Sequence, residues 1–135
     1  KIDDNDFKLI DFFIPNETEA EFYLNKKIES EKDIKSASEQ FLKKGIKNVV
    51  MTLGEKGCYF ANEKESFFIN AFKIREPVLD TTGAGDAFNG ALAVGLSKDL
   101  DIKEALTFAN KVAAISTTKQ GAATSMPSLE DLKNY

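Results

Sequence analysis

The chain has 135 residues, of which 42% are hydrophobic and 30% are charged. This composition is typical of one folded domain with a buried core, and no apolar run approaches the roughly 18 residues of a membrane-spanning helix. We therefore expect no membrane partner. The net charge is −4 and Arg75 is the single arginine, so the chain lacks an arginine-rich patch for the phosphates of nucleic acid, and we expect no nucleic-acid partner.

The chain contains no histidine and one cysteine, Cys58. Histidine bases, histidine-ligated metals and cysteine zinc clusters are therefore excluded, which leaves carboxylates, hydroxyls, lysines and backbone amides for any chemistry. A lone cysteine cannot form a disulfide within the chain, and this fits a reducing compartment. We expect a cytoplasmic location.

Short apolar runs and helical spacings alternate along the first half of the chain. Residues 9–14 form an apolar run stopped by Pro15, which predicts a buried strand. A short helix is predicted after Asn16, its N-cap, and a second helix over 31–44 ends at Gly45. Strands are predicted over 48–53 and 58–61 with a turn at 54–57 between them, and residues 67–69 resume extended structure.

Helical spacing returns at Ala84 and again from Ile102, with Asp101 as the cap of the second helix. Strands that alternate with helices predict an α/β fold.

The segment from Asp80 to Phe88, DTTGAGDAF, places two glycines where an extended stretch becomes a helix. Such a junction directs free backbone amides and the positive end of the helix dipole toward one place, which is a geometry for binding anions. Asp86 would lie beside that place, where it could accept a proton from a hydroxyl that attacks a phosphate. The alternative is a tight turn in which Asp86 only complements the helix dipole.

Two other phosphate-binding patterns do not fit this segment. A P-loop requires Gly-Lys-Ser or Gly-Lys-Thr, and neither occurs in the chain. The dinucleotide fingerprint requires a third glycine where the chain has Phe88.

Four motifs resemble those of the ribokinase-like, or PfkB-type, carbohydrate kinases. They are DTTGAGDAFNG at 80–90, PNETEAE at 15–21, TLGEKG at 52–57, and KQGA with SMP at 119–122 and 125–127. The resemblance implies a three-layer, ribokinase-like (Rossmann-like) α/β sandwich with a mostly parallel sheet. It also implies that residues 1–135 are the C-terminal nucleotide-binding and catalytic portion of that domain, without the N-terminal sugar-binding and lid portion.

The resemblance implies ATP-dependent phosphorylation of a sugar hydroxyl, with Asp86 as the base that contacts the substrate. The amides of Gly83, Ala84, Gly85 and Asp86 would hold the charge on the transferred phosphoryl group. The ATP-binding residues implied are Asn16, Thr52, Leu53, Gly54, Glu55, Lys56, Gly57, Gly85, Asp86 and Asn110. The segment 52–57 could instead be only a hairpin turn.

The resemblance also implies two metal sites. Glu19 would act on Mg²⁺ through water, although Asn16 and Glu19 also fit a capping box. A monovalent cation, K⁺, would be surrounded by Asp80, Thr82, Ser116, Lys119, Gly121 and Ser125. Lys119 could contribute only its backbone carbonyl, and Asp80 could alternatively cap a turn.

The favoured substrate is D-ribose, converted to ribose 5-phosphate, because residues 15–21 have the form seen in ribokinases proper. The alternatives are another sugar or nucleoside kinase of the family, or a non-catalytic nucleotide-binding fragment. The resemblance implies a homodimer for the full-length protein. We expect residues 1–135 alone to bind nucleotide weakly and not to phosphorylate sugar at a useful rate.

Overall fold

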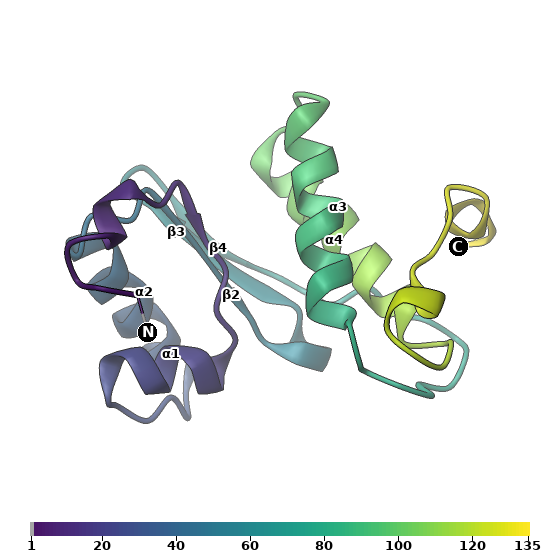
Figure 1. The fold of residues 1–135 in the computed structure, drawn as a ribbon, viewed down its shortest axis with the longest axis horizontal. Helices are drawn as coiled ribbons and strands as arrows, with labels where there is room; N and C mark the ends of the chain where they lie inside the picture. The colour runs from purple at the N-terminus through teal and green to yellow at the C-terminus, as the bar shows by residue number, and fades with distance from the viewer. Residues whose placement is uncertain (1) are drawn as a thin grey trace. The chain divides into compact units, whose positions relative to one another are not determined.

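The computed structural model describes residues 2–135, which divide into two compact units with the boundary along the chain between Ile69 and Asn70. Unit 1 contains the strands and two helices, and unit 2 contains two longer helices and the C-terminal segment (Figure 1). In the part of the chain that is described, no helix is both long and apolar enough to cross a membrane.

Unit 1 contains a four-stranded sheet in the order β1-β2-β3-β4. The strands are β1 (Phe12–Phe13), β2 (Asn48–Thr52), β3 (Cys58–Asn62) and β4 (Ser66–Ile69). β1 pairs with β2 in parallel, whereas β2–β3 and β3–β4 are antiparallel. The expected α/β class is present, but this sheet is mixed rather than mostly parallel, because short turns join β2 to β3 and β3 to β4 and such turns permit only antiparallel neighbours.

The first predicted strand is much shorter than expected. Residues Phe7–Leu9 form a 3₁₀ turn closed by the Leu9 amide, which donates to the Asp6 carbonyl at 2.9 Å. Only Phe12 and Phe13 pair with β2, and Leu9 is 74% exposed instead of buried. The prediction of a buried strand over residues 9–14 was therefore right only in placing a strand at Phe12 and Phe13, which are half-buried, and was wrong for residues 9–11 and for Ile14.

The helices of unit 1 are α1 (Glu17–Leu24) and α2 (Glu31–Lys43), as the spacing predicted. α2 packs on β2 and β3, and α1 contacts α2 and β2. Phe41 of α2 is fully buried, and its ring lies 4.9 Å from the ring of Phe13. This packing fixes the end of β1, where Pro15 and Asn16 lead into α1.

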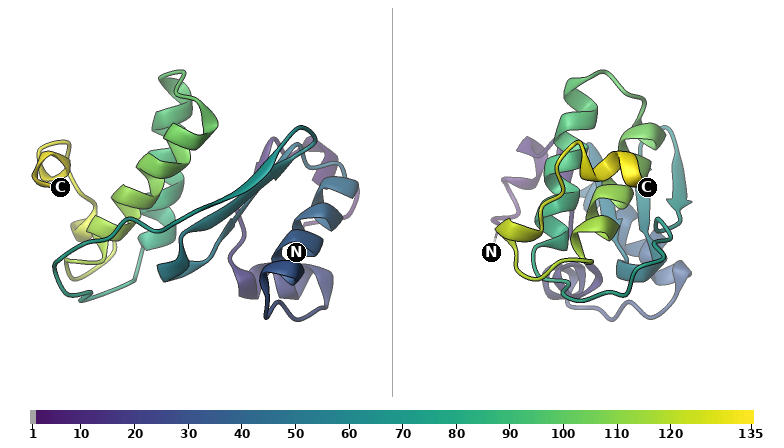
Figure 2. Two further views of the ribbon diagram at one scale, coloured as in Figure 1. Left: turned by 180° about the vertical axis from the view of Figure 1, so that it is seen from behind. Right: turned by 90° about the vertical axis from the view of Figure 1, so that its right-hand side faces the viewer.

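Unit 2 contains α3 (Ala84–Ser97) and α4 (Ile102–Ser116), which pack side by side in both views of Figure 2. The helices approach closely at Gly95, where a Cβ atom would lie 3.0 Å from the Cβ of Ala105. Phe88 and Leu92 of α3 and Leu106 of α4 are buried. One face of α3 is thus packed against α4, and this packing holds the start of α3 in place.

The segment after α4 has its own polar network around Asp131. The Asp131 carboxylate accepts from the Ser128 amide and hydroxyl, both at 2.8 Å, and lies 3.1 Å from the Lys119 ammonium. These bonds, led by the Ser128 amide, lower the pKa of Asp131 from 3.8 to about 2. The network closes the turn that precedes the last 3₁₀ helix, Asp131–Asn134.

The pKa of Asp131 predicts how this network responds to acid. A carboxyl whose pKa is lower in the folded state stabilises the fold above its unfolded pKa and loses that contribution as the pH falls through the folded value. We therefore expect the difference in unfolding free energy between the parent protein and Asp131→Asn to be constant above about pH 5 and to shrink between 3.8 and about 2. Urea titrations at several pH values measure it, and a difference that disappears already above pH 5 would contradict the prediction.

Candidate active site

The loop before α3 has the conformation that its two glycines suggest. Gly83 is the N-cap of α3 and is left-handed, with φ of 80°. A Cβ atom on Gly83 would lie 3.0 Å from the Cβ of Ala122 and 3.1 Å from its Cα. Both the backbone conformation and the lack of space therefore require glycine here.

The first turn of α3 provides backbone donors at an open surface. The Ala84 amide donates to the Thr81 carbonyl at 3.2 Å, which closes the turn. Helix geometry leaves the amides of Gly85 and Asp86 without an acceptor inside the helix. Apart from its chain neighbours and the backbone of α3 itself, no atom of the described residues lies within 4 Å of where a Cβ on Gly85 would be. Of the four amides expected to bind an anion, that of Ala84 has an acceptor in the loop, whereas α3 gives no acceptor to those of Gly85 and Asp86.

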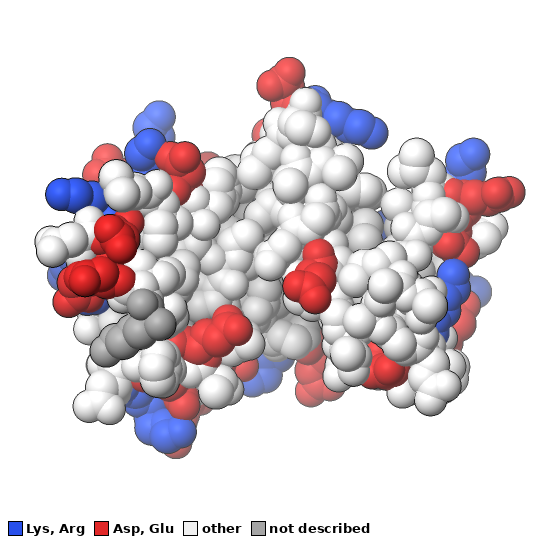
Figure 3. All heavy atoms as spheres, viewed as in Figure 1, with Lys and Arg blue, Asp and Glu red and all other residues white. Residues whose placement is uncertain are grey.

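Asp86 lies in the first turn of α3 and is exposed, next to the buried Ala87 and Phe88. It is the only charged residue of α3, and the surface over α3 in Figure 3 is largely uncharged, in contrast to the mixed charges over α1 and α2. Its carboxylate can therefore be reached by a hydroxyl from solvent, beside free amides at the positive end of a helix. This arrangement can accept a proton and hold an anion at the same place.

Asp80 joins this loop to the segment after α4. One carboxylate oxygen accepts from the Thr82 amide and the other from the Gly121 amide, each at 2.9 Å. The amides of Leu79 and Asp80 both donate to the Thr117 carbonyl, at 2.8 and 3.2 Å. Hydrogen bonds from the Thr82 side chain, and then from the Gly121 and Thr82 amides, lower the pKa of Asp80 from 3.8 to about 2.

The residues expected around a monovalent cation all lie in unit 2, and Asp80 and Gly121 are in direct contact. The hydroxyls of Ser116 and Ser125 are buried and donate to the carbonyls of Ala113 and Ala122, which leaves their lone pairs as acceptors. The Lys119 ammonium pairs with Asp131 instead. The atoms that these residues could offer as ligands to the cation are therefore oxygens, as a hard cation requires.

Asn110 is buried in α4, and its side-chain amide donates to the Asn70 carbonyl at 3.4 Å. This bond lies within unit 2 and holds the start of the unit against α4. It gives Asn110 a structural role beside the expected contact with a nucleotide.

In unit 1 the structure brings two of the motifs together. Asn16 forms an isolated parallel bridge with Thr52, and the Thr52 amide donates to the Pro15 carbonyl at 3.0 Å. The start of the expected nucleotide loop thus lies directly beside the Asn16–Glu19 motif.

The Asn16–Glu19 motif is a complete capping box. The Asn16 side chain accepts from the Glu19 amide at 2.8 Å, and Oε2 of Glu19 accepts from the Asn16 amide at 2.9 Å. Within residues 2–135 no group of three acidic or cysteine side chains could hold a metal ion. The geometry is nevertheless compatible with Mg²⁺, because that ion commonly uses one or two carboxylates together with water and phosphate, and Oε1 of Glu19 has no role in the cap.

The expected nucleotide loop, residues 52–57, is a compact connection between β2 and β3. Gly54–Lys56 form a 3₁₀ turn, and the Leu53 amide donates to the Gly57 carbonyl at 2.8 Å. Gly57 has φ of 99°, a conformation that favours glycine. Leu53 is buried, whereas Gly54, Glu55 and Lys56 are exposed and could contact a ligand.

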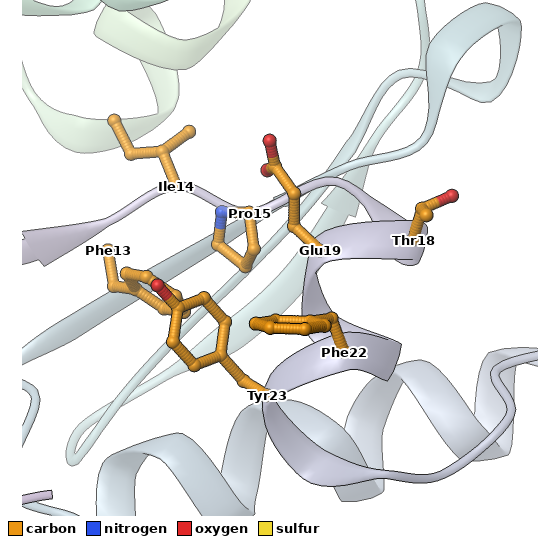
Figure 4. A pocket seen from close by; sticks show the side chains of 7 residues that line it. All are labelled: Phe13, Ile14, Pro15, Thr18, Glu19, Phe22 and Tyr23. Carbon is orange, nitrogen blue, oxygen red and sulfur yellow. The ribbon is translucent and has the colours of Figure 1, made fainter. Parts of the chain in front are cut away.

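Sequence reasoning missed a hollow of about 460 Å³ beside the capping box (Figure 4). Glu19 is the only charged residue in its lining. The signal that could have found it is Phe22, which follows the buried Ala20 of α1 by two positions and so lies away from the buried side of the helix. In the structure Phe22 is 65% exposed. The residues that line the hollow are Phe13, Ile14, Pro15, Thr18, Glu19, Phe22 and Tyr23.

Comparison with known proteins shows which family of proteins this chain resembles in sequence. Residues 5–129 match the model of the pfkB family of carbohydrate kinases. A ribokinase of Staphylococcus aureus (strain COL) is 42% identical over 125 residues, which are 92% of this chain and 40% of that protein. A deoxyribokinase of Salmonella typhi is 35% identical over 125 residues, which are 93% of this chain and 40% of that protein.

Solved structures give the same result. Arabidopsis thaliana ribokinase complexed with ribose and ATP has a TM-score of 0.92 and 30% identity, over 98% of this chain and 43% of that one. Thermotoga maritima ribokinase has a TM-score of 0.87 and 36% identity, over 98% and 44%. The chain spans about two fifths of the length of the relatives that it matches. The expected family and its α/β fold are confirmed: the chain belongs to the pfkB family of carbohydrate kinases.

Proposed function

We propose that the protein containing this chain transfers the γ-phosphoryl group of ATP to a sugar hydroxyl, with D-ribose as the favoured substrate. The observation that carries the proposal is the exposed Asp86 beside the free amides at the start of α3, behind the left-handed Gly83. Relatives named ribokinase, and a ribokinase structure with ribose and ATP, support the choice of sugar and nucleotide.

In this reaction the Asp86 carboxylate accepts the proton of the sugar hydroxyl. The hydroxyl oxygen then bonds to the γ-phosphorus while the bond from that phosphorus to the bridging oxygen of ADP breaks. The amides of Gly85 and Asp86, with Gly83 and Ala84 completing the loop, stabilise the charge on the transferred group. The carboxylate also repels a resting phosphate, so Asp86 contributes mainly in the transition state.

We assign nucleotide contacts in unit 1 to Asn16 and to the loop 52–57, where the exposed Lys56 adds a positive charge for phosphate. Asn110 is assigned to the adenine side. Glu19 would hold Mg²⁺ through water, and Mg²⁺ would neutralise phosphate charge.

In unit 2, the oxygens of Asp80, Thr82, Ser116, Lys119, Gly121 and Ser125 would hold K⁺. That ion would add positive charge beside the loop that precedes α3.

Deoxyribose is a second candidate substrate, because a deoxyribokinase is 35% identical to the chain. Ribose and deoxyribose differ in one hydroxyl group. None of the residues assigned above is proposed to contact that hydroxyl, so these residues do not distinguish the two sugars. Coupled measurement of ADP release with ribose, deoxyribose, fructose and nucleosides separates these candidates. No sugar-dependent ADP release from the full-length protein would overturn the proposed function.

Replacing Asp86 tests the assigned base. In the full-length protein, Asp86→Asn keeps the size of the side chain and removes the proton acceptor, so we expect turnover to fall at least about 100-fold, the lower limit for a general base. The KM for ATP should change little. Steady-state kinetics with ATP and ribose measure both values.

Asp99→Asn is the matched control, because Asp99 lies just after the other end of α3 and its φ of 56° is one that asparagine tolerates. Turnover in this control should equal that of the parent. An Asp86→Asn protein with parental turnover would show that Asp86 is not the base.

Replacing Glu19 separates the capping role from the magnesium role. Glu19→Gln retains an amide oxygen that can accept from the Asn16 amide, so the cap should persist, whereas the negative charge is lost. We expect the Mg²⁺ concentration for half-maximal activity to rise about tenfold, as for other residues that orient metal-bound water. Magnesium titrations of the full-length enzyme measure it.

Glu17→Gln is the control for this change, because Glu17 lies in the same first turn of α1 and is outside the capping box. If both variants shift the magnesium requirement equally, the effect comes from charge near the helix end and not from a metal role of Glu19.

A further inference from the structure

Two sets of hydrogen bonds connect the loop before α3 to the end of α4 and the segment that follows it. At Leu79 and Asp80 the connection is backbone to backbone, because both amides donate to the Thr117 carbonyl. In addition, the Asp80 carboxylate accepts from the Gly121 amide, 41 residues away in sequence, and from the Thr82 amide. One side chain therefore joins the segment at 121 to the residues just before the glycines.

The next contact transmits this connection to Gly83. Ala122 follows Gly121 and lies so close to Gly83 that a Cβ on the glycine would come within 3.0 Å of it. The buried Ser125 hydroxyl donates to the Ala122 carbonyl at 2.7 Å, which holds Ala122 in its turn. The position of Gly121 and Ala122 thus limits where Gly83 can lie.

Gly83 in turn sets the start of α3. Its carbonyl accepts from the Ala87 amide at 2.9 Å, the first bond of the helix. The amides of Gly85 and Asp86 lie between these two residues, so their direction depends on Gly83. A shift of Ala122 would change the direction of both donors.

We propose that Asp80 is a positioning residue, whose carboxylate holds the 121–122 segment against Gly83 through protein hydrogen bonds and thereby sets the direction of the Gly85 and Asp86 amides. The effect on catalysis rests on the proposed kinase function. The brace does not depend on a monovalent ion, because the groups that it joins, the amides of Thr82 and Gly121, are themselves donors to the carboxylate. A carboxylate has about four acceptor positions, so Asp80 can brace the loop and also contact a cation.

The test compares Asp80→Asn with the parent in the full-length protein. Asparagine has one acceptor oxygen in place of two, so one of the two amides loses its partner. Amide hydrogen exchange is read on peptides covering 81–86 and 119–126, in potassium-free buffer and again with K⁺. We expect exchange to be about tenfold faster in the variant in both buffers, as for the loss of one hydrogen bond to a charged acceptor. Turnover should fall about tenfold, with little change in the KM for ATP.

Asp131→Asn is the matched control. It removes a carboxylate with a similarly lowered pKa from the same C-terminal segment, but its partners are Ser128 and Lys119 rather than the loop before α3. Exchange should increase around 128–131 and remain parental at 81–86, and turnover should not change.

Three results would overturn the proposal. Parental exchange at both peptides in potassium-free buffer, with faster exchange only when K⁺ is present, would make Asp80 a cation ligand and not a brace. Faster exchange throughout α4 as well would show general loss of stability in unit 2. Faster exchange with parental turnover in an active enzyme would show that the brace does not position the amides. If the parent lacks sugar-dependent ADP release, the kinase function fails while the exchange comparison still tests the brace.

Discussion

The candidate active site depends on one steric constraint, the contact of Gly83 with Ala122. Gly83 must be left-handed to turn the chain into α3, and it has no room for a side chain. The loop is therefore fixed from two directions, by α3 packed on α4 and by the segment that follows α4. Fixed amides are effective at stabilising a developing charge because they need no reorientation during the reaction.

Unit 1 shows how one motif can have two roles without conflict. The capping box uses one oxygen of Glu19 and the side-chain oxygen of Asn16 to satisfy backbone amides at the start of α1. The remaining Glu19 oxygen lies at a helix N-terminus, where phosphate is also favoured. Capping holds the carboxylate in one place, and a residue that orients metal-bound water requires such a fixed position. The structural role therefore supports the proposed role with Mg²⁺.

Local patterns predicted the helices well, because caps and apolar spacing are properties of neighbouring residues. Asn16 and Asp101 cap the helices that they were expected to cap. The same reasoning failed for residues 9–14, because a short apolar run does not reveal which of its residues find a partner strand, and only Phe12 and Phe13 pair. The Asp80–Gly121 bond spans 41 residues and has no local signature. The glycines of the loop were recognised, but the residue that makes Gly83 necessary, Ala122, could only be found in three dimensions.

Under the proposed mechanism, the charges around α3 explain why neutral contacts and Asp80, rather than Asp86, would hold the loop. If the Gly85 and Asp86 amides could turn, they would favour the nearby Asp86 carboxylate, since a helix N-terminus attracts negative charge. The proposed base would then already accept hydrogen bonds in its resting state and would be less available to a sugar hydroxyl. A carboxylate placed before the glycines, which accepts from Thr82 and Gly121, can fix the backbone without competing for these amides. The proposed division between Asp80 and Asp86 thus separates holding the loop from taking the proton.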